Sequence, residues 1–188
     1  NSAAYLTSTS NITVQPGSVN TSAFVLNGQA SLNLAGMTPN IDGENDGTVI
    51  VENQSAGIYG KNGSRISNRG NITVGNNSVA VTSSGSGSVA INSGNIMLGS
   101  ISNGLFLKDG ANVENRAGGV ITGSSKYAIG IFADNVTAPI LNQGIITLTG
   151  DQSAGIYATG ASKKVIDNSG IITIGNSADP LNPGIGIY

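Results

Sequence analysis

The residue types that most often carry out catalysis are largely missing from this chain. It contains no histidine and no cysteine, which excludes Ser-His-Asp and Cys-His catalysis as well as histidine and thiolate metal sites. Carboxylates remain, and most of them are isolated in the sequence, as are Asp109, Asp134, Asp151, Asp167 and Asp179. Because acid–base cleavage of polysaccharides needs paired carboxylates, we expect no catalytic residues and no enzyme activity.

One acidic cluster lies between Asp42 and Gly47. In Asp42-Gly43-Glu44-Asn45-Asp46-Gly47, acidic side chains occupy alternate positions and glycine is sixth, as in the first half of an EF-hand calcium loop. The twelfth position, however, is Asn53, where an EF-hand needs a bidentate glutamate. A calcium site and a polar turn both stay open, and the pattern favours the turn. We therefore expect no metal site and no cofactor.

Aromatic side chains recur at one position of a repeated motif. Ser55-Ala56-Gly57-Ile58-Tyr59 returns unchanged as Ser153-Ala154-Gly155-Ile156-Tyr157. The isoleucine before each ring fits the inward register of a strand, so the rings are expected to point outward, where they can stack on sugars or contact a partner protein. A stacked column that only shields the strand edge is the alternative. The predicted aromatic strip consists of Tyr59, Phe106, Phe132, Tyr157 and Tyr188.

An internal repeat predicts the elements that position these rings. Units of about 23 to 27 residues open at Asn45, Asn68, Asn92, Asn115, Asn142 and Asn168. Each unit holds three short β-branched segments separated by turns, such as Ile72-Thr73-Val74, Val79-Ala80-Val81 and Val89-Ala90-Ile91,. Strands this short must pair with the equivalent strand of the next unit. The chain is therefore predicted to be all-β, a parallel β-helix with three strands per coil.

The opening asparagines are predicted to lie inside the coil, where each side-chain amide bonds to the same amide in the next coil. The glycine two residues later, as in Asn68-Arg69-Gly70, is expected to supply a positive φ. In one unit Ala117 replaces it and the glycines shift to Gly118 and Gly119, so we expect a modified turn there. The serine-rich run Ser83–Ser88 is expected to be a flexible excursion.

Two regions are expected along the chain. Residues 1–44 keep strand-like triplets at Ile12–Val14, Phe24–Leu26 and Leu32–Leu34 but lack the Asn-x-Gly register, which predicts irregular first coils. Residues 45–188 are predicted to form regular repeats. Because the chain ends on Ile185-Gly186-Ile187-Tyr188, the pattern of a strand in a further coil, we expect it to be a piece of a longer solenoid.

Composition narrows the range of partners. Charged residues make up 10% of the chain and the net charge is −2, so bulk electrostatics predict no binding to nucleic acid. No apolar run approaches the ~20 residues that a membrane helix needs. The regularly placed isoleucine and valine residues indicate that the chain is folded.

The repeated Asn-x-Gly-x-Ile-x-Val segment followed by Ser-x-Gly-Ile-Tyr resembles the passenger repeats of large type V autotransporter adhesins, particularly those of fusobacteria. The copies Asn68–Val74 and Ser153–Tyr157 carry the resemblance, which covers Asn45–Tyr188. It implies a right-handed parallel β-helix displayed outside the bacterial outer membrane and anchored through a C-terminal barrel outside this sequence. Such passengers attach the cell to host cells or to other bacteria. Their partners vary, so the resemblance supplies no binding residues.

We therefore expect a monomeric, non-enzymatic adhesion or stalk segment of the bacterial cell surface, whose partner is a host-cell receptor protein or glycan, or another bacterium. Two alternatives stay open. A carbohydrate-active enzyme, either a polysaccharide lyase or a hydrolase, can be built on the same fold, and it would need several carboxylates converging on one groove. The head of a trimeric surface adhesin is suggested by Ser78–Val81 and Ser88–Ile91, although the coils of that family are shorter.

Overall fold

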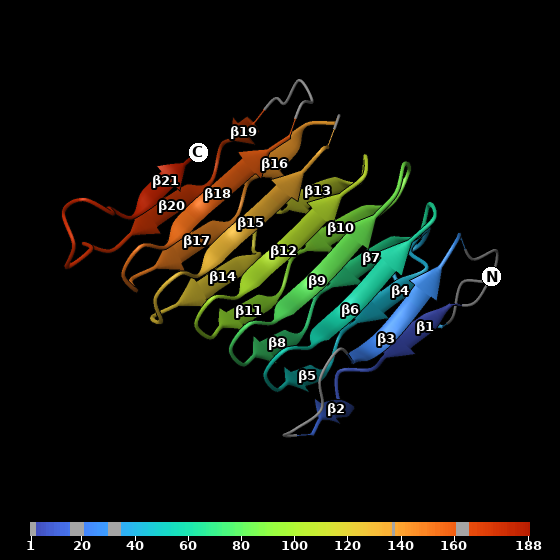
Figure 1. Cartoon of the computed structure of the whole chain (residues 1–188). Coiled ribbons are helices and arrows are strands. Elements are labelled where there is room, and N and C mark those ends of the chain that lie inside the picture. Colours follow the sequence, from blue (N-terminus) through green and yellow to red (C-terminus); the bar gives the residue numbers. More distant parts are fainter. Residues whose placement is uncertain (1–2, 16–20, 30–34, 137, 161–165) are drawn as a thin grey trace.

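The computed structural model describes residues 3–15, 21–29, 35–136, 138–160 and 166–188. Within these ranges the chain forms strands and turns, arranged as three parallel sheets of seven strands each. The chain visits the sheets in turn, so every coil contributes one strand to each sheet (Figure 1). The fold is the predicted right-handed parallel β-helix with three strands per coil. No helix in the described ranges is long and apolar enough to cross a membrane.

The three sheets are named A, B and C in the order in which the chain enters them. Sheet A contains β1 (Ala4–Leu6), β4 (Gly43–Asn45), β7 (Arg65–Asn68), β10 (Val89–Asn92), β13 (Asn112–Asn115), β16 (Ile140–Asn142) and β19 (Ile166–Asn168). Sheet B contains β2 (Asn11–Val14), β5 (Thr48–Val51), β8 (Asn71–Val74), β11 (Asn95–Leu98), β14 (Val120–Gly123), β17 (Ile145–Leu148) and β20 (Ile171–Ile174). Sheet C contains β3 (Ser22–Asn27), β6 (Ala56–Lys61), β9 (Val79–Ser84), β12 (Asn103–Lys108), β15 (Ile129–Asp134), β18 (Ala154–Thr159) and β21 (Ile185–Ile187).

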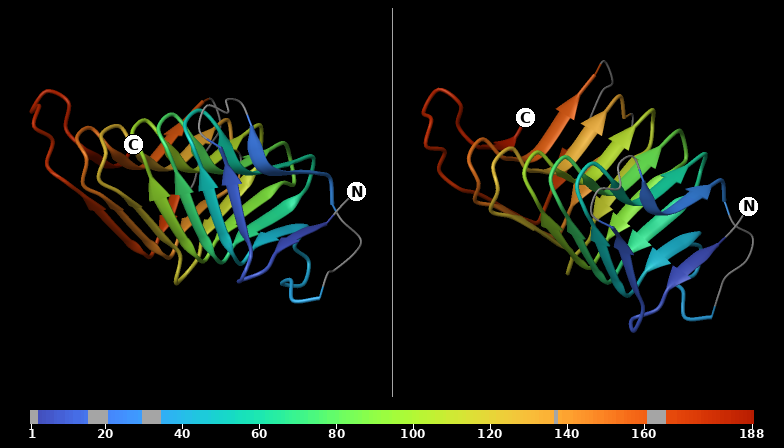
Figure 2. Two further views of the ribbon diagram at one scale, coloured as in Figure 1. Left: turned by 90° about the horizontal axis from the view of Figure 1, so that it is seen from below. Right: turned by 60° about the horizontal axis from the view of Figure 1, so that its bottom comes forward.

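The core is a column of aliphatic side chains enclosed by the three sheets. Strand alternation turns Ile72 and Val74 of β8 inward, where they are buried, and turns Thr73 outward. Ile58 and Leu105 of sheet C are likewise fully buried. Each such side chain contributes about 1.5–3 kcal/mol relative to exposure. The coils stack along one axis, as both views in Figure 2 show, so this core continues from coil to coil.

The glycines that follow the opening asparagines are needed for a reason other than the predicted one. Gly47, Gly70, Gly94, Gly144 and Gly170 do not have positive φ, so that prediction is wrong. A Cβ on Gly94 would instead overlap the carbonyl oxygen of Gly70 in the preceding coil, and a Cβ on Gly170 would overlap that of Gly144. Close contact between the turns of successive coils therefore excludes any side chain at these positions.

The predicted modified turn is present in the unit that contains Ala117. Four residues, Arg116–Gly119, separate β13 from β14, whereas two separate β10 from β11. Gly118 has a φ of 90°, which favours glycine. Gly119 makes the close contact with the preceding coil, because a Cβ there would lie 2.6 Å from the carbonyl oxygen of Asn92.

The serine-rich run does not form the predicted excursion. Ser83 and Ser84 are the last residues of β9, and the chain then turns tightly through Gly85 and Gly87, both of which have positive φ. The Ser88 hydroxyl donates to the carbonyl of Ser84 over 2.8 Å. It also accepts the N–H of Gly63, from the preceding coil, over 2.9 Å. Small side chains that bond to the backbone make this turn compact.

The first coil belongs to the same three sheets, because β1, β2 and β3 pair in register with β4, β5 and β6. In the connection from β3 to β4, residues 35–42 lie against the outer face of sheet A, where Met37 and Ile41 pack with Ile91. The expected strand at Leu32–Leu34 lies outside the described residues.

Candidate functional site

The opening asparagines form a hydrogen-bonded ladder inside the rod, at the end of each sheet A strand from β4 onward. Each side-chain amide nitrogen donates to the Oδ1 of the next asparagine. The donor–acceptor distances are 2.7 Å for Asn45 to Asn68, 2.9 Å for Asn68 to Asn92, 2.9 Å for Asn92 to Asn115, 2.7 Å for Asn115 to Asn142 and 2.6 Å for Asn142 to Asn168. All are fully buried except Asn168. This ladder stabilises the corner between sheets A and B.

A second polar ladder, not predicted from the sequence, lies in the turn that leads into sheet C. The N–H of Ser55 donates to the Oγ of Ser78 over 3.2 Å, and the N–H of Ser78 donates to the Oγ of Ser102 over 3.1 Å. Ser153 accepts the N–H of Ala128 in the same way, over 3.2 Å. A serine four residues before the aromatic position was the available signal. These bonds link the starts of β6, β9 and β12, and those of β15 and β18.

The acidic segment Asp42–Gly47 contains strand β4, so its backbone is extended there and does not follow the course of an EF-hand loop. Strand alternation turns Asn45 into the interior and Glu44 toward the outer face of sheet A. The fully buried Glu44 carboxylate accepts hydrogen bonds from the N–H and the hydroxyl of Thr38, both over 2.7 Å. Asp42, in contrast, accepts the N–H of Arg65 over 2.7 Å, so the three acidic side chains of the segment have separate hydrogen-bond partners.

Arg69 neutralises these carboxylates. Its guanidinium lies 3.4 Å from Glu44 and 3.1 Å from Asp46, and the hydroxyl of Tyr5 donates to Asp46 over 3.3 Å. Desolvation raises the pKa of Tyr5 and the Asp46 carboxylate raises it further. Desolvation lowers the pKa of Arg69, but the two carboxylates raise it overall. Among the described residues, no three His, Cys, Asp or Glu side chains are arranged to hold a metal ion.

The predicted aromatic side chains lie in one row across the outer face of sheet C. In this aromatic row the ring centroids of Phe106 and Phe132 are 5.2 Å apart, those of Phe132 and Tyr157 are 5.4 Å apart, and those of Tyr157 and Tyr188 are 4.7 Å apart. The first and last of these pairs are stacked, with interplanar angles of 16° and 5°. The middle pair is tilted by 46°, so the four rings form two stacked pairs joined by one tilted contact.

Tyr59 belongs to the same row but is separated from those four rings. It pairs in register with Thr82 of the next coil, and Thr82 pairs with Phe106 of the coil after that. In the coils before and after, the position equivalent to Thr82 therefore carries an aromatic ring. Thr82 was not predicted as a position of the row, although aligning Ser78–Thr82 with Ser55–Tyr59 was a sufficient signal.

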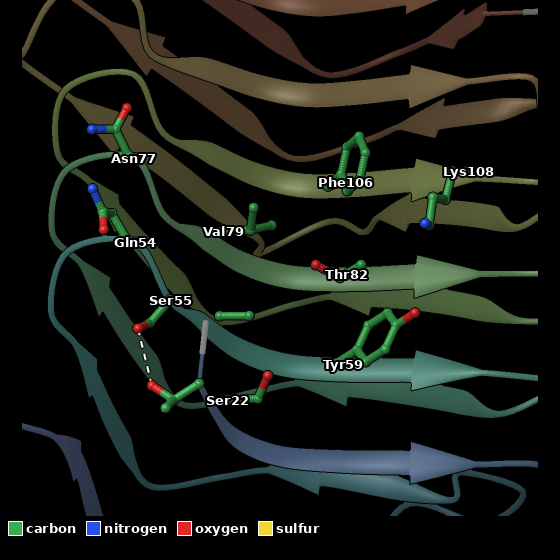
Figure 3. A pocket seen from close by; sticks show the side chains of 11 residues that line it. Ser22, Gln54, Ser55, Tyr59, Asn77, Val79, Thr82, Phe106 and Lys108 are labelled. Carbon is green, nitrogen blue, oxygen red and sulfur yellow. Dashed lines mark hydrogen bonds between the residues drawn. The ribbon is translucent and has the colours of Figure 1, made fainter. Parts of the chain in front are cut away.

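The interruption opens a pocket of about 440 Å³ on sheet C. The rings of Tyr59 and Phe106 lie on opposite sides of Thr82, as Figure 3 shows. From Thr82 the pocket extends along the strands over Val79 to the turns that carry Gln54 and Asn77. Lys108 lies at its other end (Figure 3).

The lining of this pocket suits a small polar ligand. Aromatic and aliphatic groups form its walls, and hydroxyl, amide and ammonium groups stand at separate points along it. A largely apolar lining with a few placed polar groups is usual for a small-molecule site, although here it forms a shallow depression that is open to solvent. The pocket can therefore hold a cyclic ligand. The ring of the ligand would stack against the aromatic side chains, and its substituents would form hydrogen bonds with the polar ones.

Comparison of the chain with protein-family models, with curated proteins and with solved structures finds no match in any of the three. The fold and the geometry of sheet C are therefore the observations from which function is inferred.

Proposed function

We propose that this chain is a rigid, non-enzymatic adhesion segment of a bacterial cell-surface protein, with the outer face of sheet C as its contact surface. The observation that carries the proposal is the aromatic row, in which Phe106, Phe132, Tyr157 and Tyr188 form an unbroken line of neighbouring rings on the outside of the rod. Scattered exposed rings are ordinary, whereas a contiguous apolar strip is characteristic of an interaction surface. Aromatic side chains are also enriched among the residues that dominate binding energy.

The construction of the rod supports a role in display. Strands of one coil pair with strands of the next in all three sheets, and the asparagine ladder adds buried side-chain bonds between coils. Parallel stacking of this kind produces an extended and stiff scaffold. It would hold the aromatic row in a straight line, so that several rings meet a partner surface together.

The cellular setting is part of the proposal. The repeated Asn-x-Gly and Ser-x-Gly-Ile-Tyr motifs favour a type V autotransporter passenger, displayed at the cell surface and anchored by a barrel in a longer chain. Its partner would be a host receptor protein, a host glycan or another bacterium. The sheets close around a single core, which is consistent with a monomer. The rival enzymatic role is disfavoured because the clustered acids Glu44 and Asp46 are paired with Arg69.

The test is binding of the purified fragment to epithelial cells and to partner bacteria. The test variant changes Tyr59, Phe106, Phe132 and Tyr157 to serine. It removes these outward-pointing rings of the aromatic row. We expect saturable binding by the parent fragment and loss of most of that binding in the variant. Far-UV circular dichroism would verify that both chains retain the β-helix.

A matched control changes four apolar residues on the outer face of sheet B to serine. Ile50, Met97, Ile145 and Ile171 are 38–58% exposed, so their replacement removes a comparable number of apolar side chains from another face. This control should bind as the parent does. Equal loss in both variants, or no binding by the parent fragment, would refute sheet C as an adhesive face.

A further inference from the structure

We propose that the interruption of the aromatic row at Thr82 is a saccharide-binding slot, which accepts one pyranose ring with equatorial hydroxyl groups between Tyr59 and Phe106. The inference rests on the proposed function, because it names the partner chemistry of the same face. It concerns one position of that face, however, and can fail while the adhesive role of the row stands.

The first argument is the space between the two rings. Consecutive rings of the row lie 4.7–5.4 Å apart. Tyr59 and Phe106 are separated by two strand spacings, because Thr82 pairs with both, which corresponds to about 9 to 10 Å. The position of one ring is therefore vacant, and Phe106 has a ring neighbour, Phe132, on one side only. A ligand ring placed over Thr82 would complete the stack.

The second argument is the hydroxyl group of Thr82. The residue is 8% exposed and lines the pocket, yet this hydroxyl has no hydrogen-bond partner among the described residues. Because it lines an open pocket, this hydroxyl is free to bond to water or to a ligand, and a ligand that displaces the water must replace that hydrogen bond. An aromatic side chain from a partner protein would fill the space and leave the hydroxyl unsatisfied. A sugar would fill the space and also form the hydrogen bond.

The third argument is the arrangement of polar groups along the pocket. The exposed amides of Gln54 and Asn77 mark the turn end, and Lys108 marks the other end. Between Thr82 and the amides the pocket floor is apolar, over Ala56 and Val79. This spacing suits a disaccharide, with one sugar between the rings and the next extending toward the amides. Lys108 is the one charged side chain that lines the described pocket, and its ammonium is balanced by the Asp109 carboxylate 4.0 Å away, so the ligand is expected to be neutral.

The two-sided slot determines which sugars fit. The electron-rich face of an aromatic ring attracts polarised C–H groups. A β-glucopyranose ring has all its substituents equatorial and presents axial C–H groups on both faces, so it can contact Tyr59 and Phe106 at once. Galactose differs only in an axial hydroxyl at C4, which would project from one face toward a ring. The slot should therefore prefer gluco-configured sugars.

The test is a titration of the isotopically labelled protein, followed by NMR. The probes are methyl β-D-glucopyranoside, its C4 epimer methyl β-D-galactopyranoside, and cellobiose. We expect saturable shifts of the Tyr59, Thr82 and Phe106 signals with the glucoside, at about millimolar affinity, and affinity for the galactoside lower by about fivefold or more. Cellobiose should bind more tightly than the glucoside and should also shift the side-chain signals of Gln54 and Asn77.

Two variants identify the slot. Thr82→Phe places a ring in the vacant position and should abolish glucoside binding, whereas Thr73→Phe, at an outward position on sheet B, should leave it unchanged. Tyr59→Ser removes one wall and should weaken binding by about tenfold, which keeps the test informative if Thr82→Phe fails to fold. Equal affinity for the two epimers, or undiminished glucoside binding by a folded Thr82→Phe or Tyr59→Ser variant, would overturn the proposal.

The two proposals can fail separately. If cells bind through the aromatic row but no glycoside binds, the slot is wrong and the adhesive face stands. If the glucoside binds at Thr82 but the fragment binds neither cells nor bacteria, the slot stands and the proposed adhesive role is wrong.

Discussion

Truncation of one ladder asparagine tests whether buried amides hold the coils together. Asn92 is fully buried and takes part in three hydrogen bonds. It accepts from Asn68 over 2.9 Å, and it donates to Asn115 over 2.9 Å and to the carbonyl of Gly94 over 3.2 Å. Asn92→Ala removes all three and leaves the facing groups of its two neighbours without their ladder partner. At about 0.5–1.5 kcal/mol for each bond, with an added penalty for the unpaired groups, the cost is about 3 to 5 kcal/mol.

The matched control is Asn95→Ala, three residues further along the same coil. Asn95 is exposed and donates one hydrogen bond, over 3.0 Å, to the Oδ1 of Asn71. Its loss should cost less than about 1 kcal/mol. Urea unfolding followed by circular dichroism measures the difference. With a slope of about 2 kcal/mol/M, Asn92→Ala should lower the midpoint by about 1.5 to 2.5 M. Equal midpoints for the two variants would refute the stabilising role of the ladder.

Three further changes probe other parts of the structure. Gly94→Ala should destabilise the rod by about 3 kcal/mol or more, because the new methyl group meets backbone of the preceding coil, whereas Gly186→Ala, which meets nothing within 4 Å, should be nearly neutral in thermal unfolding. Arg69→Ala removes the ion pair of the buried Glu44 carboxylate and leaves it the two hydrogen bonds from Thr38. Because Arg69 is itself partly exposed, the cost should be about 2 to 3 kcal/mol, below that of a fully buried pair; a melting temperature equal to that of the parent would contradict this pairing. The hydrogen bond from Asn182 lowers the pKa of Asp179 in the folded protein. The contribution of this carboxylate to stability should therefore be complete above the ordinary aspartate pKa of about 3.9, and it should be lost as the pH falls through the lower pKa of the folded state. Carboxyl-carbon NMR should show this low midpoint, and it should rise in Asn182→Ala.

The architecture could be predicted because each coil repeats the same local pattern. The alternating apolar residues Ile72 and Val74 predict which face of the strand is buried, and the recurring asparagine predicts where the coil turns from one sheet to the next. Both signals lie within a few residues of each other. A strand of three or four residues then has only its copy in the next coil as a pairing partner, so the sheet topology followed from the repeat.

Other features depend on contacts between coils, which local patterns do not encode. Gly94 was expected to supply a backbone conformation, but its role is to make room for a carbonyl oxygen that belongs to the coil of Gly70. The covering of sheet A by Met37 and Ile41 lies in a segment without a repeat, so no periodicity predicted it.

The candidate site was only partly accessible from the sequence. The outward rings of the aromatic row could be predicted from the repeated Ser-x-Gly-Ile-Tyr motif. The missing ring at Thr82 could have been found by aligning Ser78–Thr82 with Ser55–Tyr59, but the pocket could not, because it depends on the strand of Thr82 lying between those of Tyr59 and Phe106. The pocket therefore results from one missing ring between two aromatic neighbours.

Competition binding tests the adhesive role of sheet C most directly. Labelled fragment is bound to epithelial cells or partner bacteria and challenged with an excess of unlabelled protein. The account predicts that unlabelled parent fragment displaces the label, whereas the variant with Tyr59, Phe106, Phe132 and Tyr157 changed to serine does not. Displacement by that folded variant as effective as displacement by the parent would show that the bound surface lies elsewhere, and would contradict the account.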